Sequence, residues 1–586
     1  MDNKRYTNIF YVIVIVIAGV LVYINTVNKS FFWDDEVLIA NNVHIRSFSN
    51  IPYFFNPGYA NVYEQAGGER YRPLRTVTFV FDYMFWKENA AGYHITNITM
   101  HIIVALILFF MVKTMTKNNL AAFLSGLVFV LHPVHTESVV YIKNRSDILC
   151  AIFFILSFMF YVKYISKEGR PEKVGNPGLR KDVIYYAASI FVFILALVSK
   201  EMAITLPFIL AGYIIFLKRD NIKMNFILTI PYFAVLAVYF GFRKFIMKST
   251  YASADISSIN DRIFVVLHTV GGYTKLLILP LNLCADRTLV ITRNLFSLEV
   301  ILAILTLFIL IPFIIIKRNE LNFWLFFLLF TLIPASNLVF LAGRPFAEQR
   351  LYLPSIGFSV FLGILLAKIK NYKAVLGTVL SVIILTAYSS ATIARNFDWK
   401  NEEVLWEKTV KTNPVSARAH HNLAVVYGKK GRYGEAIEQL NKSLQLDNKF
   451  FDSYNTLGWV YFKMKLYKES IKTFEKGLEI APANYEMAAN LGGLYNITGE
   501  YAKAERLYKE IIRQYPWMYR SYYNLAVSYM VTNRKQEAIN YFYKTIELNP
   551  YYKEAYGKLY EIYTKENNTV EMERLKQTAE KFKVNI

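Results

Sequence analysis

The residues of this sequence that could do chemistry gather just outside long apolar runs. The run Phe32-Trp33-Asp34-Asp35-Glu36 directly follows the first of these runs. Acidic side chains at a membrane surface beside aromatic rings are costly to desolvate, so they indicate a bound cation, a proton or a hydrogen-bonding substrate. A carboxylate here, Asp34 or Asp35, could accept a proton from an attacking hydroxyl group. If the run stood alone, solvated acids at the end of a membrane span would be the better interpretation.

Further polar motifs lie in other segments that we expect on the same side of the membrane. Acids, histidines and arginines that converge near one interface are typical of a site for an anionic, lipid-linked substrate. The candidate substrate-binding residues are therefore Arg72, His94, His132, His135, Glu137, Arg145, Lys200, Glu201, Arg344, Glu348, Arg350 and Tyr352.

Simpler roles stay open for several of these residues. The stretch from His132 to Glu137 holds two histidines and an acid that could ligate a metal, but without an HExxH helix, hydrogen bonding is the commoner use. Lys200 and Glu201 could form an interfacial ion pair, and Arg145 could cap the span that it precedes. The sequence thus specifies no cofactor and leaves a requirement for a divalent metal open.

The apolar runs themselves predict a membrane body that spans the bilayer many times. The chain has 586 residues, of which 54% are hydrophobic, and a mean hydropathy of +0.27. A run of about 20 apolar residues can cross a bilayer, and it must be helical because hydrocarbon offers the backbone no other hydrogen-bond partner. We expect about eleven spans, near 8–27, 94–114, 120–140, 147–165, 183–199, 202–217, 224–242, 300–316, 322–334, 355–367 and 374–394.

Basic clusters between the spans account for the formal net charge of +22 better than nucleic-acid binding does. These clusters share one side of the membrane if the N-terminus is cytoplasmic. A crossing at the apolar stretch 262–279 would move every later cluster to the other side, so we expect an interfacial or re-entrant helix there. An odd number of spans then places the C-terminal domain on the extracytoplasmic side with the long loops. For a prokaryotic protein this means a multi-pass protein of the inner or plasma membrane.

Internal repeats are clear after Thr412. The pattern Leu423-Ala424…Tyr427…Ala436…Leu440 recurs three more times in register, with the period of about 34 residues of tetratricopeptide repeats. Residues 402–411 are similar to the second helix of a degenerate leading unit, and the tail from Lys553 is similar to a capping pair. The expected fold is all-α, with a helical membrane domain in residues 1–395 and a tetratricopeptide-repeat solenoid in residues 396–586.

The concave face of such a solenoid usually binds extended or helical peptide. Asn422, Asn490 and Asn524 occupy one repeat position, and amides there could pair with both the N–H and C=O groups of an extended backbone. Asparagine is also common at this position of the repeat for other reasons. These residues are kept as a candidate peptide-binding site.

Seven stretches together carry a family resemblance: WDDE (33–36), YRPL (71–74), GYHITNITMH (92–101), LHPVHTESVVYIKNRSDIL (131–149), SKE (199–201), PASNL (334–338) and AEQRLYLPSIG (347–357). They resemble the transmembrane and tetratricopeptide-repeat O-mannosyltransferases, over nearly the whole chain. The resemblance implies a glycosyltransferase of the GT-C superfamily that moves mannose from a polyprenyl-phosphate donor to serine or threonine hydroxyls of proteins.

The resemblance also implies roles for residues. One of Asp34 and Asp35 would be the general base on the acceptor hydroxyl, and the other a positioning or metal-contacting acid. A departing phosphate is an anion, so cationic groups would lower the barrier. The short repeat array and a composition rich in Lys, Ile, Asn and Tyr indicate a prokaryotic relative, which leaves the sugar and acceptor open. Motif positions suited to the donor phosphate hold Arg72, His132, His135, Arg344 and Arg350.

The expected partners are a polyprenyl-phosphate-linked sugar, an acceptor protein and membrane lipid, with no nucleic acid. The alternative is a non-catalytic membrane scaffold whose repeats recruit another protein. A transporter is less favoured, because the charged groups gather at one interface and trace no path through the membrane midplane. Asp34 and Asp35 separate the first two hypotheses, since a scaffold should tolerate Asn at both positions and a transferase should not.

Overall fold

The computed structural model is helical throughout its regular structure. It describes all residues except 1, 57–70, 167–177, 247–258, 289–292, 317, 339–343, 345, 583 and 585–586. The described residues form no β-strand, and one isolated bridge pairs Arg287 with Phe346. Contacts divide the chain into two compact units, Met1–Pro414 and Val415–Ile586.

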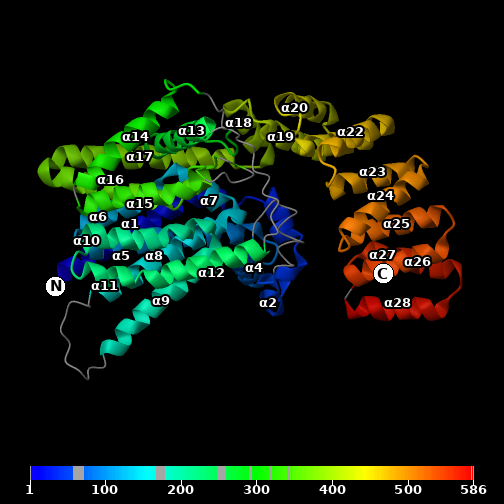
Figure 1. Cartoon of the computed structure of the whole chain (residues 1–586), viewed down its shortest axis with the longest axis horizontal. Helices are drawn as coiled ribbons and strands as arrows, with labels where there is room; N and C mark the ends of the chain where they lie inside the picture. Colours follow the sequence, from blue (N-terminus) through cyan, green and yellow to red (C-terminus); the bar gives the residue numbers. More distant parts are fainter. Residues whose placement is uncertain are drawn as a thin grey trace. The chain divides into compact units, whose positions relative to one another are not determined.

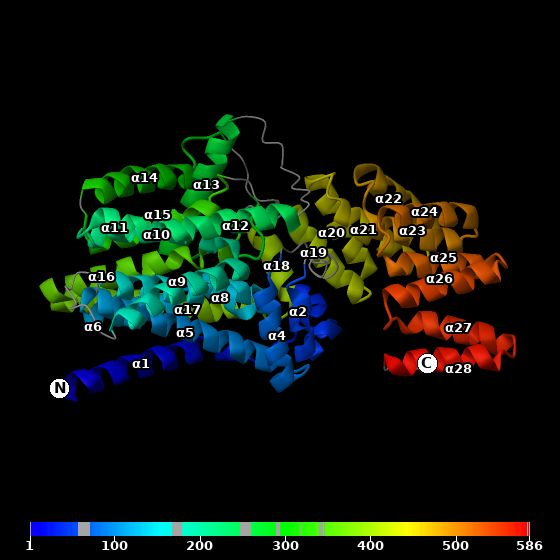
Figure 2. The ribbon, with the colours of Figure 1, turned by 60° about the horizontal axis from the view of Figure 1, so that its bottom comes forward.

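Long apolar helices make up most of the first unit (Figures 1 and 2). They are apolar on nearly every face, as expected of helices that face lipid or one another. In chain order they are α1 (Asp2–Tyr23), α5 (Ala90–Thr116), α6 (Asn119–Leu131), α8 (Arg145–Ile165), α9 (Gly178–Ser199), α10 (Leu206–Leu217), α12 (Ile230–Ile246), α13 (Ile259–Ile278), α14 (Leu298–Ile316), α15 (Glu320–Leu332), α16 (Pro354–Tyr372) and α17 (Ala374–Asp398).

Length and composition single out a smaller set of these as membrane spans. Among the described residues, five helices are long and apolar enough to cross: Tyr6–Thr26, Ala90–Thr116, Ile142–Ile165, Ile222–Lys244 and Ala374–Asp398. The pair Asn119–Leu131 and Pro133–Val140 could be a sixth, broken span, bent by 49°. Shorter apolar helices occupy Val183–Ser199, Glu201–Leu217, Leu298–Ile314 and Glu320–Ala335. The predicted membrane helices are therefore confirmed, whereas the predicted number of about eleven spans is not.

The stretch 262–279, whose relation to the membrane the charges left ambiguous, is helical as far as residue 278, where α13 ends. It is not among the candidate spans. Its expected interfacial or re-entrant position stays a prediction.

Close helix packing in the first unit depends on glycine. A side chain added at Gly363 of α16 would lie 2.4–2.8 Å from atoms of Ser125 on α6, and one at Gly357 would meet the backbone of α15 at Leu328. Small residues let membrane helices approach closely in this way.

The break after α6 creates the segment on which the polar residues converge. Proline cannot supply a helical N–H group, and Pro133 stands just after the end of α6. The side chain of His132 instead accepts a hydrogen bond from the N–H of Val134, at 3.3 Å. Three short helices follow, η6 (Pro133–His135), α7 (Thr136–Val140) and η7 (Ile142–Asn144). Every residue from 132 to 147 is buried, and we call this stretch the connecting segment.

The second unit consists of five helix pairs in series (Figure 1). They are α19 (Ala417–Lys429) with α20 (Tyr433–Leu446), α21 (Phe451–Lys463) with α22 (Tyr467–Ile480), α23 (Tyr485–Ile497) with α24 (Tyr501–Gln514), α25 (Tyr519–Val531) with α26 (Lys535–Leu548), and α27 (Lys553–Lys565) with α28 (Thr569–Lys581). The last pair matches the capping pair expected from Lys553 onward.

The same turn joins the two helices of each pair. One residue takes a positive φ of 54–81°, and the N–H of the next residue donates to the carbonyl of a tyrosine near the end of the first helix, at 2.7–3.0 Å. This is the usual way to end a helix with a left-handed residue. The left-handed positions are Gly431, Lys465, Gly499, Asn533 and Asn567.

Helix α18 (Glu402–Thr412) forms where a degenerate repeat helix was expected, but it belongs to the first unit. The division into compact units thus falls after Pro414, later than the boundary predicted after residue 395. Contacts define compactness rather than function, so the predicted functional division into 1–395 and 396–586 stays a prediction.

Candidate functional site

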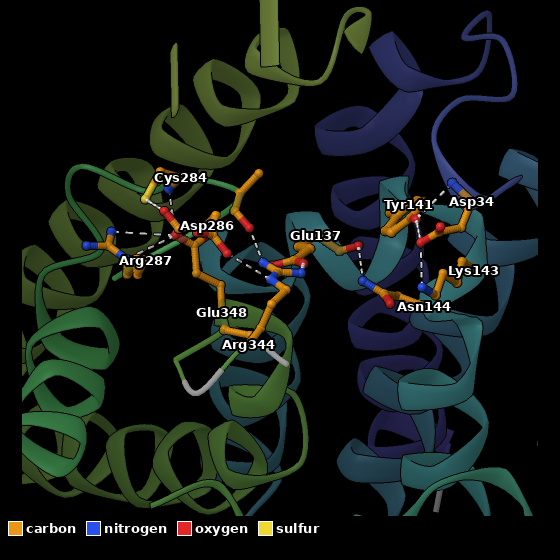
Figure 3. Close-up of polar contacts among 12 residues, drawn as sticks. Asp34, Glu137, Tyr141, Lys143, Asn144, Cys284, Asp286, Arg287, Arg344 and Glu348 are labelled. Carbon is orange, nitrogen blue, oxygen red and sulfur yellow. Dashed lines mark hydrogen bonds and ion pairs between the residues drawn. The ribbon is translucent and has the colours of Figure 1, made fainter. Parts of the chain in front are cut away.

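Asp34 is held against the connecting segment by one of its two carboxylate oxygens (Figure 3). Oδ2 accepts hydrogen bonds from the Tyr141 hydroxyl at 2.6 Å and from Lys143 Nζ at 2.5 Å. The backbone N–H of Asp34 donates to the same tyrosine oxygen at 3.2 Å. Oδ1 accepts no hydrogen bond from the described part of the chain, and the side chain is 16% exposed. Asp34 is therefore fixed in place while one oxygen stays available.

Asp35 lies in a different environment although it is the next residue. Its side chain is fully buried, and Oδ1 accepts the backbone N–H of Lys143 at 2.8 Å. Oδ2 is buried and has no hydrogen-bond partner among the residues that the structure describes. Burial raises the pKa of Asp35 to about 8, although the Lys143 N–H group opposes this shift. At neutral pH this carboxyl group is therefore mostly protonated and uncharged.

Trp33 precedes the acid pair in a strained conformation. Its φ of 57° lies in the left-handed region, which bulky residues rarely adopt. The ring stacks on Tyr141, with centroids 5.2 Å apart and planes within 7°, and the Arg344 guanidinium carbon lies 5.9 Å from its centroid. Strain held at one residue is a mark of functional sites. Here the stack brings Asp34 and Arg344 to the same pair of aromatic rings.

Arg344 is positioned by acids from two other segments. It forms ion pairs with Glu137 at 2.8 Å and with Asp286 at 3.6 Å, and it donates a hydrogen bond to the Ala285 carbonyl. Its side chain is 15% exposed. An incoming anion would therefore share this guanidinium with two carboxylates. Figure 3 shows how the contacts of Asp34 are linked to those of Arg344. The side chain of Asn144, the residue after Lys143, donates to the backbone carbonyl of Glu137 at 3.4 Å.

A second set of ion pairs lies at the far end of the connecting segment. Arg72 donates to the Ser146 hydroxyl at 3.2 Å and pairs with Glu201 at 3.5 Å. Lys200 pairs with Asp147 at 2.5 Å, and both side chains are about 5% exposed or less. Predicted residues from two separate motifs, YRPL and SKE, therefore meet on the connecting segment.

Arg145 serves the packing of the first unit. It is fully buried and pairs with Asp82 of α4 (Pro73–Trp86) at 2.5 Å. It also donates to Asn97 at 2.6 Å and lies over the Phe79 ring at 4.9 Å. Its described contacts are thus to protein groups, and its predicted role in substrate binding stays a prediction.

The predicted histidines and Tyr352 lie in the buried core. His132 pairs with the Leu277 carbonyl at 2.9 Å, and His135 pairs with the Ser355 hydroxyl at 2.7 Å. Tyr352 pairs with His101 at 2.7 Å, and His94 is 1% exposed. No three His, Cys, Asp or Glu side chains of the described residues are grouped so that they could hold a metal.

Glu348 and Arg350 lie on η10 (Glu348–Leu351). Glu348 is buried, accepts the Cys284 N–H at 2.7 Å, and pairs with Arg395 at 3.3 Å and Arg287 at 3.5 Å. Burial raises the pKa of Glu348 despite these arginines. Arg350 is partly exposed.

The structure thus gathers part of the predicted set and leaves part aside. Around the connecting segment it brings together Asp34, Asp35, Arg72, Glu137, Arg145, Lys200, Glu201 and Arg344. His132 and His135 belong to the same segment, but their ring nitrogens pair with Leu277 and Ser355 in the buried core. The sequence interpretation missed three partners, Tyr141, Lys143 and Asp286. Tyr141 and Lys143 stand within the stretch 131–149 that carries the family resemblance, so that stretch held the signal. Asp286 stands alone in its loop and offers no such signal.

The candidate ladder in the repeats is only partly arranged as expected. Asn490 is exposed, and its amide donates to Asn455 of the preceding repeat at 3.0 Å. Asn422 and Asn524 are partly exposed. Peptide binding by these residues stays a prediction.

Known proteins are similar to this chain in the repeats and over most of its length. Tetratricopeptide-repeat models match residues 416–483, 455–516 and 498–553. The Caenorhabditis elegans protein O-mannosyl-transferase F38B6.6 is 26% identical over 471 residues, which cover 77% of this chain and 64% of the relative. The family resemblance is confirmed.

Two further relatives show the same relation. The human protein O-mannosyl-transferase TMTC1 is 27% identical over 75% of this chain and 55% of its own length. The Xenopus laevis protein O-mannosyl-transferase tmtc2 is 25% identical over 74% of this chain and 62% of its own length. The chain therefore spans less than two thirds of these relatives.

Proposed function

We propose that this chain is a membrane glycosyltransferase that moves a sugar, mannose, from a polyprenyl-phosphate donor to a hydroxyl group of an acceptor protein. The names of its relatives support the reaction class. The single observation that carries the proposal is the carboxylate of Asp34, which is anchored through Oδ2 and available through Oδ1. A general base has to be fixed in this way and still reach its proton.

In the proposed reaction the acceptor hydroxyl gives its proton to Oδ1 of Asp34. The hydroxyl oxygen forms a bond to the anomeric carbon of the sugar as the bond from that carbon to the phosphate oxygen breaks. The electron pair leaves on the polyprenyl phosphate. One proton moves to Asp34, and the anomeric carbon exchanges its bond to the phosphate oxygen for a bond to the acceptor oxygen. No atom changes oxidation state, so the step needs no oxidant or reductant.

Cationic groups near Asp34 would stabilise the leaving phosphate. Lys143 touches the same carboxylate, Arg344 lies across the Trp33 ring, and Arg72 lies at Ser146. Charge-assisted hydrogen bonds to phosphate are strong, and arginine offers a planar pair of donors. Each of these cations is paired with a carboxylate here. Binding of the lipid-linked sugar would therefore replace a carboxylate with its phosphate as the partner of the cation.

Asp35 has a separate role in this proposal. A carboxyl group that is buried and mostly protonated at neutral pH is a poor base for a hydroxyl proton. Its hydrogen bond to the Lys143 N–H instead fixes the backbone whose side chain reaches Asp34. Asp34 is thus the general base, and Asp35 is the positioning acid.

The proposal includes location and partners. The site and the repeats would lie on the extracytoplasmic side of an inner or plasma membrane, with a cytoplasmic N-terminus. The partners would be the lipid-linked sugar and an acceptor protein that the repeats recruit. Concave repeat surfaces usually bind peptide, which supports this last part.

The test is transfer by the purified full-length chain in liposomes. Labelled polyprenyl-phosphate mannose and a mixture of proteins are supplied, and label in protein is counted. We expect transfer by the wild type and a loss of at least about 100-fold in Asp34→Asn. The matched control is Asp261→Asn on α13, where the carboxylate pairs with Arg293 at 2.9 Å. Folded wild type that transfers none of several lipid-linked sugars would favour the scaffold.

A further inference from the structure

One face of helix α18 contacts two parts of the candidate site, Trp33 next to Asp34 and the loop residues 285–286 that hold Arg344. Glu402 accepts the backbone N–H of Trp33, and the Trp406 ring meets the Trp33 ring edge-on, with centroids 4.9 Å apart. Trp406 is 2% exposed. The first turns of α18 therefore hold the residue that precedes Asp34.

The last turn of the same helix holds the loop that positions Arg344. Thr409 accepts the N–H of Ala285 at 3.2 Å. Asn413, the C-terminal capping residue, donates to the Asp286 carbonyl at 3.0 Å and to Thr288 at 3.2 Å. The Ala285 carbonyl and the Asp286 carboxylate are two of the groups that hold Arg344.

The spacing of these four residues explains how one helix does both. Glu402, Trp406, Thr409 and Asn413 follow one another at intervals of four, three and four, which places them on one face. A helix rises about 1.5 Å per residue, so the two ends of this face are about 16 Å apart. A rigid rod of that length fixes one loop relative to the other.

We propose that this face of α18 is a positioning element, which sets the Asp34 base and the Arg344 cation at the separation that transfer requires. Glu402, Thr409 and Asn413 are positioning residues that act through Trp33 and residues 285–286. The inference rests on the proposed function for its effect on rate. Misplacement of reacting groups by about 1 Å can cost about 100-fold in rate, so small shifts here matter.

The first test compares two threonines of α18. Thr409→Val removes the hydroxyl that holds Ala285 with little change of shape, and Thr412→Val is the matched control, because no hydrogen bond of the Thr412 hydroxyl is found among the described residues. We expect Thr409→Val to lower kcat by about tenfold or more, with KM for donor and acceptor within about threefold. Thr409→Ser should restore most of the rate. Equal rates for Thr409→Val and Thr412→Val in an active enzyme would overturn the inference and leave the proposed function standing.

The second test needs no activity. Amide hydrogen exchange is measured on peptides that contain Trp33–Asp34 and Ala285–Asp286, in the full-length wild type and in variants of matched thermal stability. Thr409→Val should speed exchange at 285–286, and Glu402→Met, which removes the oxygen that accepts the Trp33 N–H, should speed exchange at 33–34, each relative to Thr412→Val. Unchanged exchange at both places would contradict the positioning role even if the wild type transfers no sugar.

Discussion

At the scale of single residues, the neighbouring Asp34 and Asp35 lie in surroundings that differ in exposure and in hydrogen bonding. Asp34 keeps 16% of its side chain exposed, and within the described part of the chain only its Oδ2 accepts hydrogen bonds. Asp35 is fully buried, and its Oδ1 accepts the backbone N–H of Lys143. The environment rather than the residue type separates a base from a structural acid.

The buried state of Asp35 predicts a pH dependence of stability. Its pKa is raised from 3.8 to about 8 in the folded protein, with burial as the largest cause. The folded state therefore holds a proton that the unfolded chain releases between about pH 4 and 8. The contribution to stability is full below about pH 4 and declines as pH rises toward 8.

Thermal unfolding of Asp35→Asn checks this prediction, because the amide has no proton to lose. From pH 5 to pH 8 the melting temperature of the wild type should fall by roughly a few degrees more than that of the variant. Parallel curves for the two proteins would show that Asp35 is not protonated in the folded state.

The sequence could identify the acid pair but not the partners that assign its roles. WDDE stands out because acids beside aromatic residues at a span end are costly. Tyr141 and Lys143 are ordinary residues until the fold places them on Asp34. Likewise Arg145 resembles a substrate-binding cation in sequence, yet the structure surrounds it with Asp82, Asn97 and Phe79. Such pairings join segments far apart in the chain, so local patterns do not contain them.

At the scale of helices, apolar runs predicted the elements well, whereas the predicted number of about eleven crossings is not confirmed. The predicted run 94–114 lies within α5, and 374–394 lies within α17. The run 120–140 instead breaks near Pro133, and the predicted run 322–334 is a short helix that ends in a 3₁₀ turn. Hydropathy reports apolar length, whereas crossing also depends on breaks and packing.

The repeat turns make a prediction at this scale. Lys465 adopts φ of 61° where two other repeats have glycine, and a left-handed conformation costs a residue with a Cβ atom roughly 1 kcal/mol. Lys465→Gly should stabilise the array by about 1 kcal/mol, and Gly499→Lys should destabilise it by a similar amount. Denaturant unfolding of the full-length chain, followed in the repeats, measures both changes.

Asn533→Gly is the matched control, because asparagine tolerates the left-handed region and its replacement should change little. Equal effects at Lys465 and Asn533 would mean that the turn conformation does not set the stability. The repeats could be found in sequence for another reason, because leucine, a small residue and tyrosine recur at fixed places of each unit, as at Leu423, Ala424 and Tyr427.

At the scale of the whole molecule, the proposal requires the repeats on the extracytoplasmic side. Both native cysteines are buried, so an introduced cysteine can report its side of the membrane. Val570 in α28 is 63% exposed and Tyr6 in α1 is 69% exposed. In intact cells a membrane-impermeant maleimide should label Val570→Cys and leave Tyr6→Cys unlabelled until the membrane is opened.

Labelling of Tyr6→Cys but not Val570→Cys in intact cells would reverse the orientation and separate the repeats from an extracytoplasmic acceptor. Labelling of both would require an even number of crossings between them. The positive-inside rule predicts labelling of Val570→Cys alone, because the basic clusters then share the cytoplasmic side.

The central claim is that Asp34 is the base of a sugar transfer and that Asp35 only positions it. The most direct measurement is the initial rate of transfer from labelled polyprenyl-phosphate mannose by Asp34→Asn and Asp35→Asn, in the same liposomes at pH 7. Asp34→Asn should lose about 100- to 10,000-fold. Asp35→Asn should stay within about tenfold of the wild type, because an amide is uncharged and keeps an oxygen for the Lys143 N–H. A larger loss in Asp35→Asn than in Asp34→Asn, with both variants folded, would contradict the account.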